Sequence, residues 1–411
     1  MSKYSLYLDH AASTPCRPEV LEAMAPCFLA NAGNPASIHS AGRRAKAALE
    51  DARARVAGQL GATPREIVFT ASATESIDLA LRGVVAARRD AGGHLVTSNA
   101  EHHAVLHTCH ALAREGLEMT VLPVNRFGCL QSDQVAAAIR PDTILCSIMH
   151  ANNEVGTITP VEEIARAVKE QNPRCLVHTD ATASIGHLQL DLGQSHVDLA
   201  SFSAHKFYGP KGIGGLYVRQ GTPLLPRLLG GGQERNLRSG TPAVPLAVGM
   251  AVALEMACAE IDSEKACWSP LRDALTRALT ATVPHCHLNG HPTDRLPTHV
   301  NLSFLGVSGE DLVLRLDLLG VCASTGSACT TGSVEPSHVL TAMGLPHPWA
   351  LGSLRLTLGH GCRDMAVEPL VAEIARIVAQ LRSTSGYRSP WQVRPPPQGM
   401  TMVKDDPQVT M

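Results

Sequence analysis

A lysine, an aspartate and a cysteine stand in contexts that could support covalent chemistry on one cofactor. Lys206 directly follows Ser203, Ala204 and His205, and Asp180 stands upstream in the segment HTDA. Cys329 lies much later, in the loop segment GSACT. A lysine amine can hold a cofactor aldehyde as a Schiff base, an aspartate can pair with a pyridinium nitrogen, and a thiolate is a strong nucleophile. Together these residues predict pyridoxal 5'-phosphate (PLP) chemistry with a thiol nucleophile.

The segment TASATES, residues 70–76, is a candidate site for the phosphate of that cofactor. Small residues such as Ala73 and Thr74 allow backbone N–H groups to approach an anion, and the N-terminus of a following helix favours negative charge. The alternative is an ordinary helix start with Thr74 as the N-cap. Ser203 and His205, which stand beside the lysine, favour the phosphate.

The elements that must position these residues form an alternating α/β pattern. Several expected strands are apolar on both faces, which predicts a covered, mostly parallel sheet with helices between the strands. Ligands collect at the carboxyl ends of strands in such sheets, so Asp180, Lys206 and the Thr74 turn should share one edge. The expected strands are 66–70, 94–98, 119–124, 144–150, 175–180, 198–203 and 214–218, and helices are expected at 75–85 and 161–169.

His102 follows the second of these strands, so we expect it at the same edge of the sheet. Its imidazole could stack on a flat cofactor and move protons. The alternative function for this region is a metal site, because His103, His107 and His110 have helical spacing. No carboxylate stands at a matching spacing, and histidine-rich helix faces are usually solvated, so we expect no metal.

The pattern changes near residue 260, which predicts a second, smaller α+β domain. We expect a large domain over residues 16–258, a small domain built from residues 1–15 and 259–385 that carries the Cys329 loop, and a loose Pro-containing tail over residues 386–411. Expected elements of the small domain are helices at 260–279, 309–319 and 366–382 and strands at 299–304, 320–324 and 355–358.

Composition limits the kinds of partner and compartment. The chain has 411 residues and a formal net charge of −2, so no overall basic field favours nucleic acid or a membrane surface. The N-terminal residues lack a long apolar stretch, and the apolar run 246–258 is too short to span a bilayer. None of the 12 cysteines forms a Cys-x-x-Cys pair. We therefore expect a cytoplasmic protein whose thiols are mostly free.

The ordered series of motifs resembles the cysteine desulfurases of the NifS/IscS type, within the class V aminotransferase-like PLP enzymes. The resemblance runs from about Tyr7 to Arg382. The matching segments are Gly33-Asn34-Pro35, Ala73-Thr74-Glu75-Ser76, Glu101-His102, Asn152-Asn153-Glu154-Val155-Gly156, His178-Thr179-Asp180-Ala181, Ser203-Ala204-His205-Lys206, Gly209-Pro210-Lys211-Gly212, Arg238-Ser239-Gly240-Thr241, Gly326-Ser327-Ala328-Cys329-Thr330 and Glu335-Pro336-Ser337-His338.

This resemblance implies a homodimer with the architecture of PLP-dependent transferases of fold type I, including a mostly parallel seven-stranded sheet. Lys206 would carry the cofactor, Asp180 would pair with the pyridine nitrogen, and His102 would stack on the ring. The resemblance also implies that the phosphate is held by Ala73, Thr74, Ser203, His205 and, from across the dimer interface, Thr241. Asn153 would lie near the ring hydroxyl. Asn34 and Arg355 would bind the substrate carboxylate.

The implied reaction converts L-cysteine to L-alanine and leaves the sulfur on Cys329 as a persulfide, for transfer to an acceptor such as an iron–sulfur scaffold protein. His102 is the candidate acceptor of the thiol proton. Two alternatives remain open: a selenocysteine or cystine lyase on the same fold, and a catalytically weak scaffold protein. One departure from the family pattern is Ala183, which stands where the family usually has a glutamine that donates a hydrogen bond to the cofactor.

Overall fold

The apolar runs of the first part of the chain form one seven-stranded sheet in the computed structural model, which describes residues 5–30, 32–326 and 335–384. The strand order is β2-β8-β7-β6-β5-β3-β4. The five strands β3 to β7 are parallel to one another, and β8 is antiparallel to both of its neighbours, β2 and β7. The predicted mostly parallel sheet is confirmed. The strands are β2 (Ile67–Thr70), β3 (His94–Ser98), β4 (Glu118–Leu122), β5 (Thr143–Ser147), β6 (Leu176–Asp180), β7 (Leu199–Ser203) and β8 (Gly214–Val218).

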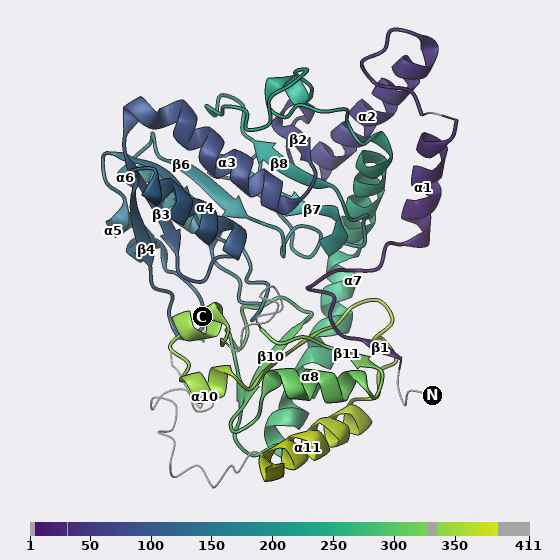
Figure 1. Ribbon diagram of the computed structural model, residues 1–411, viewed down its shortest axis with the longest axis vertical. Helices are drawn as coiled ribbons and strands as arrows, with labels where there is room; N and C mark the ends of the chain where they lie inside the picture. Colours follow the sequence, from purple (N-terminus) through teal and green to yellow (C-terminus); the bar gives the residue numbers. More distant parts are fainter. Residues whose placement is uncertain (1–4, 31, 327–334, 385–411) are drawn as a thin grey trace.

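Helices cover both faces of this sheet, as its all-apolar strands require (Figure 1). Successive strand residues point to opposite faces, so Leu95 and Leu145 join one apolar cluster while Val96 and Cys146 join another. The first cluster contains α3 (Ala73–Arg88) and α4 (His103–Arg114). The second contains residues of α1 (Pro18–Phe28), α2 (Ser40–Gln59), α5 (Ser132–Ala138), α6 (Val161–Gln171) and the first part of α7 (Val244–Thr282).

A smaller lobe lies below this sandwich in Figure 1 and has its own apolar core. Its antiparallel sheet has the order β12-β10-β9, and β1 pairs in parallel with β11 beside it. Val300 and Leu356 point into the core, whereas Asn301 and Arg355 form a polar face. The elements of the lobe are β1 (Leu6–Tyr7), β9 (Cys286–Leu288), β10 (His299–Phe304), β11 (Val321–Cys322), β12 (Ser353–Thr357), α8 (Gly309–Asp317), α9 (His338–Ala342), α10 (His347–Ala350) and α11 (Val367–Thr384).

Helix α7 joins the two lobes. It runs without a break from Val244 to Thr282, so the separate helix expected at 260–279 is wrong in its start. Its first part packs in the core of the large lobe, and Trp268 and Leu275 pack in the core of the small lobe. By length and composition α7 could cross a membrane, but half of its most apolar window is buried and it packs against α1, α2 and α11. We interpret α7 as the shared core helix of the two lobes.

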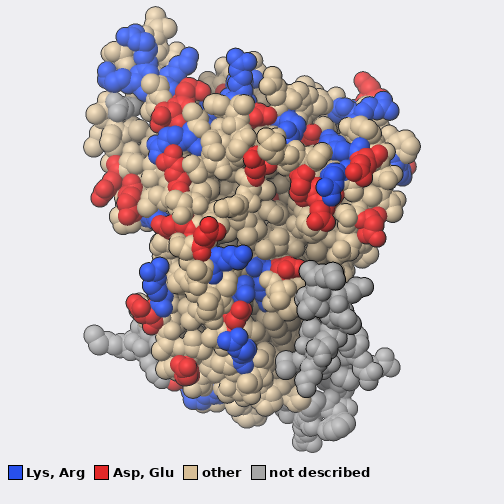
Figure 2. All heavy atoms as spheres, turned by 180° about the vertical axis from the view of Figure 1, so that it is seen from behind, with Lys and Arg blue, Asp and Glu red and all other residues tan. Residues whose placement is uncertain are grey.

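Four short 3₁₀ turns complete the described elements: η1 (Pro64–Glu66), η2 (Arg89–Ala91), η3 (Ala204–Lys206) and η4 (Glu234–Asn236). The turn η3 places Lys206 directly after β7, at the carboxyl edge of the sheet. On the face shown in Figure 2, basic and acidic side chains are interspersed over the large lobe.

Candidate active site

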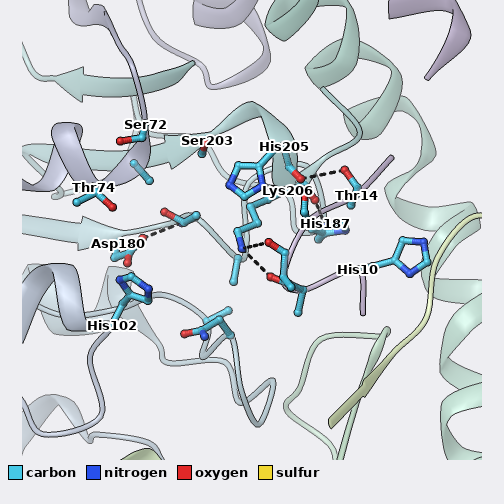
Figure 3. Close-up of a pocket in the computed structure, with 18 of the residues that line it drawn as sticks. His10, Thr14, Ser72, Thr74, His102, Asp180, His187, Ser203, His205 and Lys206 are labelled. Atoms are coloured by element: carbon cyan, nitrogen blue, oxygen red, sulfur yellow. Dashed lines mark hydrogen bonds between the residues drawn. The ribbon is translucent and has the colours of Figure 1, made fainter. Parts of the chain in front are cut away.

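A cavity of about 470 Å³ lies at the carboxyl edge of the large sheet (Figure 3). Residues of both lobes line it, because Arg355 and Leu358 of the small lobe face Asp180 and Lys206 of the large one. The cavity brings together most of the site residues predicted from the sequence: Ala73, Thr74, His102, Asn153, Asp180, Ser203, His205, Lys206 and Arg355.

Three predicted site residues are not brought together with these in one chain. Asn34 is exposed on the connection between α1 and α2, where its Oδ1 accepts a hydrogen bond from the Ala36 backbone N–H at 2.9 Å. Thr241 is exposed just before α7. Neither of them lines the cavity, and Cys329 lies outside the described residues. The roles expected for these three residues stay predictions.

The turn between β2 and α3 presents a helix N-terminus to the cavity. Helix α3 begins at Ala73, and Ser72 is its N-cap, with its hydroxyl accepting the Glu75 N–H at 3.2 Å. The alternative of Thr74 as an ordinary N-cap is therefore wrong. Because the first N–H groups of a helix have no partner within the helix, those of Ala73 and Thr74 remain available to an anion.

Lys206 enters the cavity from η3, and the N-terminal segment holds its amine. Its Nζ donates hydrogen bonds to the carbonyls of Ala11 at 2.6 Å and Ala12 at 3.0 Å (Figure 3). The preceding carbonyl, of His205, accepts the Thr14 N–H and the Thr14 hydroxyl, each at 2.9 Å. The lysine is thus fixed at both its backbone and its side chain.

Asp180 at the end of β6 and His102 just beyond β3 both line the cavity, and they lie near each other at the left of Figure 3. Asp180 is 3% exposed, and its Oδ1 accepts the Thr182 N–H at 3.0 Å. Burial lowers the pKa of His102 below its usual value, so the ring is neutral at neutral pH. A buried aspartate and a neutral imidazole thus line the same part of the cavity.

The proton of the neutral His102 ring can be assigned from its hydrogen bond. Nδ1 accepts the Ala104 N–H at 3.1 Å as the N-cap of α4. An accepting nitrogen carries no proton, so the neutral ring has its N–H at Nε2. His102 therefore offers a donor from Nε2, and it can take up a further proton only if the capping bond to Ala104 is released.

Arg355 points from β12 toward the large lobe and is 3% exposed. Its Nη2 donates to Asp9 Oδ1 at 2.8 Å and its Nη1 to the Asn153 carbonyl at 3.1 Å. Its Nε has no hydrogen-bond partner among the described residues. A planar guanidinium suits a carboxylate, and Arg355 presents one at the cavity wall.

The residues present fit PLP. The cavity joins an amine, a buried carboxylate and a helix N-terminus, which match the aldehyde, the pyridine nitrogen and the phosphate of that cofactor. Ser203 and His205 flank the phosphate position; the Ser203 hydroxyl now donates to the Ile213 carbonyl at 3.1 Å, and His205 Nδ1 lies 3.2 Å from Ser13 Oγ. Ala183 also lines the cavity, and its methyl group cannot donate a hydrogen bond there.

The alternative of a metal site on α4 gains no support from the described residues. His103 and His107 have ring centroids 5.0 Å apart, but they form no three-ligand cluster with His110. The described residues contain one such cluster, Glu260, Glu264 and His360. There, a guanidinium already supplies the positive charge, because Arg17 bonds to both Glu260 and His360.

Sequence reasoning missed several residues that line the cavity. The N-terminal segment from His10 to Thr14 lies across it, although these residues are far from Lys206 in sequence. The pairing of Asp9 with Arg355 fixes this segment. His187 and His299 also line the cavity. The only sequence signal for His187 is its place shortly after Asp180, beyond the end of a central strand.

Comparison with known proteins identifies the class of this chain. Residues 6–368 match the family model described as Aminotransferase class-V. A solved structure titled "NIFS-LIKE PROTEIN" superposes with a TM-score of 0.86 at 38% identity, covering 92% of this chain and all of the other. The chain therefore belongs to the class-V aminotransferase family, whose members share the PLP fold expected from the sequence.

Relatives within that family narrow the class further. A protein named Cysteine desulfurase IscS from Dictyoglomus turgidum is 46% identical over 95% of this chain and 99% of its own length. The structure titled "SspA in complex with cysteine" has a TM-score of 0.75 and 38% identity over 86% of this chain and 98% of the other. The prediction of a PLP-dependent cysteine desulfurase is thereby confirmed at the level of family.

Proposed function

We propose that this protein removes the sulfur of L-cysteine, releases L-alanine and holds the sulfur as a persulfide on Cys329. The observation that carries the proposal is the cavity that joins Lys206, Asp180 and the α3 N-terminus to Arg355. The first three suit PLP, and the last suits an amino-acid carboxylate. The bound structure of the SspA relative, which contains cysteine, supports the same substrate.

Groups of the large lobe would hold PLP. Lys206 would bind its aldehyde carbon, Asp180 its pyridine nitrogen, and the N-terminus of α3 its phosphate, with His102 over the ring and Asn153 near the ring hydroxyl. Ala73, Thr74, Ser203 and His205 contribute to the phosphate position. When bound, the cofactor supplies an electron sink that makes the Cα–H bond of the substrate acidic.

The remaining steps belong to side chains of this chain. Arg355 orients the substrate through its carboxylate, and Asn34 is proposed to assist. When it is not bound to the cofactor, the Nζ of Lys206 could take the Cα proton of the substrate, because the side chain stays attached at the same strand end. Hydrogen bonds from Nζ to the Ala11 and Ala12 carbonyls provide a resting place for that amine.

Sulfur transfer needs a thiolate at Cys329. The thiolate attacks the substrate sulfur, the S–S bond of the persulfide forms, and the C–S bond breaks with its electrons remaining on the carbon fragment that becomes alanine after protonation. Once His102 has taken the thiol proton and become an imidazolium, it can return a proton to that carbon fragment. As the acceptor of the thiol proton, His102 must first release its bond to Ala104.

The proposal extends to the partners of the protein and to its compartment. We propose a homodimer in which Thr241 of the partner subunit completes the phosphate site, and an acceptor protein, such as an iron–sulfur scaffold, that takes the sulfur in the cytoplasm. We also propose that residues 16–258 and residues 1–15 with 259–385 act as the two domains, with residues 386–411 as a tail. The parallel pairing of β1 with β11 and the two separate apolar cores support that division.

The test is the product of one incubation of PLP-loaded protein with L-cysteine, in parallel with a Cys329→Ala variant. We expect alanine from the wild type and almost none from the variant. If neither forms alanine although PLP is bound, the proposed function is wrong, and selenocysteine and cystine become the next substrates to assay.

A further inference from the structure

The backbone carbonyl of Lys206 also has a side-chain partner, in addition to the contacts of its amine and of the preceding His205 carbonyl. His187 Nε2 lies 3.0 Å from the carbonyl oxygen of Lys206, within hydrogen-bond distance. Gly186 makes this approach possible: it has a φ of +82°, and a Cβ at that position would lie 2.7 Å from the Cβ of Phe207. The turn after β6 is therefore built to bring His187 against the Lys206 backbone.

The second ring nitrogen of His187 faces a carboxylate. Nδ1 lies 3.3 Å from Glu264 Oε2, on helix α7, and the side chains of His187 and Glu264 are only 13% and 7% exposed. Glu264 is ionised, because contacts with His187 and His360 outweigh its burial and lower its pKa to about 2. A carbonyl and a carboxylate can only accept hydrogen bonds, so both nitrogens of His187 donate.

With both ring nitrogens donating, His187 is an imidazolium. Although burial opposes the charge, the hydrogen bond to Glu264 raises the pKa of His187 above its usual value. Two further groups lie near the pair: His360 Nε2 lies 3.6 Å from Glu264 Oε1, and Arg17 bonds to Glu260 on the same helix. The ion pair with Glu264 thus orients the His187 ring, so that Nε2 is directed at the Lys206 carbonyl.

We propose that His187 is a positioning residue for the catalytic lysine: its Nε2–H, oriented by Glu264, holds the Lys206 carbonyl in place while the Lys206 amine exchanges partners. The inference deepens the proposed function and rests on it for the role of Lys206. During turnover the Lys206 amine must leave its covalent partner and return to it. Throughout this exchange the position of the side chain depends on the position of the Lys206 backbone. A displacement of about 1 Å in such a group can cost about a hundredfold in rate.

The structure offers a paired test. In His187→Gln the amide nitrogen falls near the position of Nε2, so it can still donate to the Lys206 carbonyl. In His187→Asn the shorter amide falls near Nδ1, which retains the contact with Glu264 and loses the one with Lys206. The two variants are similarly polar, and neither carries a charge, so the position of the donor is the main difference between them.

The first readout is the rate at which each apoprotein takes up PLP covalently, followed by visible absorbance. This rate depends on Lys206 and not on desulfuration. We expect His187→Asn to lower it, and to lower kcat with L-cysteine, by about tenfold to a hundredfold, with KM nearly unchanged. His187→Gln should remain within about threefold of the wild type in both.

The matched control is His94→Gln in β3. His94 is also buried between two partners, Thr143 Oγ1 and Thr120 Oγ1, each at 2.8 Å, and it does not line the cavity. The His94→Gln variant should unfold at a lower midpoint than the wild type but take up PLP at the same rate. Equal rates for His187→Gln and His187→Asn, whether near those of the wild type or equally low, would overturn the proposal. The expected ranking in PLP uptake without any alanine from the wild type would instead overturn the proposed desulfurase function alone.

Discussion

At the scale of single residues, the site follows from where a few reactive side chains stand relative to strand ends. Asp180 ends β6, Lys206 follows β7 by a single turn, and His102 lies just beyond β3. These three could be predicted because parallel strands bring their carboxyl ends to one edge. His187 could not, since its role depends on Glu264, which lies 77 residues away in the chain.

Ala183 stands where the resemblance to the family implies a glutamine, and Ala183→Gln tests the cost of its absence. Ala183→Gln should add a hydrogen-bond donor at the cavity wall. One such bond contributes about 0.5–1.5 kcal/mol, so we expect PLP to bind about twofold to tenfold more tightly. The measurements are the Kd for PLP and the pH titration of its bound absorbance. Identical constants and titration curves for the variant and the wild type would mean that position 183 does not contact the cofactor.

Glu101 is a buried carboxyl group whose charge is costly. Burial raises its pKa to about 8. Its Oε1 accepts hydrogen bonds from Ser98 and Met149, while Oε2 has no partner among the described residues. Between its unfolded pKa and about 8 the folded state retains a proton that the unfolded state has lost, so this group lowers stability as pH rises.

Glu101→Gln should remove that pH dependence, because a glutamine oxygen can keep both bonds without titrating. We expect the variant to gain stability relative to the wild type by about 2–4 kcal/mol more at pH 8 than at pH 5. Urea unfolding of both proteins at the two pH values measures the gain. A difference between variant and wild type that is the same at both pH values would show that Glu101 ionises normally.

At the scale of elements, the sequence predicted the central strands well and their boundaries less well. Strands β3 and β8 have the expected bounds, since buried apolar runs define them. The expected strand 144–150 ends at Ser147, because the chain then turns to form the bridge between Ala151 and Ile158. The start of α3 was placed too late because Ser72, and not Thr74, forms the capping bond.

A buried ion pair holds the segment before Thr241 against β2. Both terminal nitrogens of Arg53 donate to Glu234 at 2.7 Å, and Glu234 also accepts the Phe69 N–H at 2.9 Å. The turn at Glu234, Arg235 and Asn236 has positive φ throughout, a conformation that side chains disfavour. We infer that the ion pair keeps this strained turn in place.

Glu234→Ala should therefore destabilise the protein by about 3–5 kcal/mol, because it leaves the Arg53 guanidinium buried without its main partner. Glu50→Ala is the matched control: Glu50 contacts the same arginine but its side chain is 50% exposed, so its loss should cost less than about 1 kcal/mol. Unfolding midpoints in urea measure both. Similar losses for the two variants would contradict the ion pair as the structural anchor.

At the scale of the whole molecule, two lobes share the site and one helix. The polar face of the small sheet supplies Arg355, the edge of the large sheet supplies Asp180 and Lys206, and α7 connects the two cores. The change of pattern near residue 260 indicated two domains. It did not reveal that one helix continues through that point, because a long buried helix has apolar residues on more than one side.

The proposed homodimer makes a prediction that a single chain cannot satisfy. Thr241 is exposed and lies outside the cavity of its own chain, as expected if it serves the cavity of the partner. The Thr241→Ala homodimer and the Lys206→Ala homodimer should each have low desulfurase activity. A mixed dimer would contain one intact site and should recover about half of the wild-type activity. Activity no higher than the mean of the two parents would show that Thr241 does not act across an interface.

The central claim is that sulfur moves from L-cysteine to Cys329, and mass spectrometry of the Cys329 peptide tests it most directly. The PLP-loaded protein is incubated with L-cysteine without reductant and digested. We predict that this peptide gains the mass of one sulfur atom, that a thiol reductant removes it, and that a Lys206→Ala protein shows no gain. Alanine formed with no added sulfur on Cys329 at any time would contradict the account.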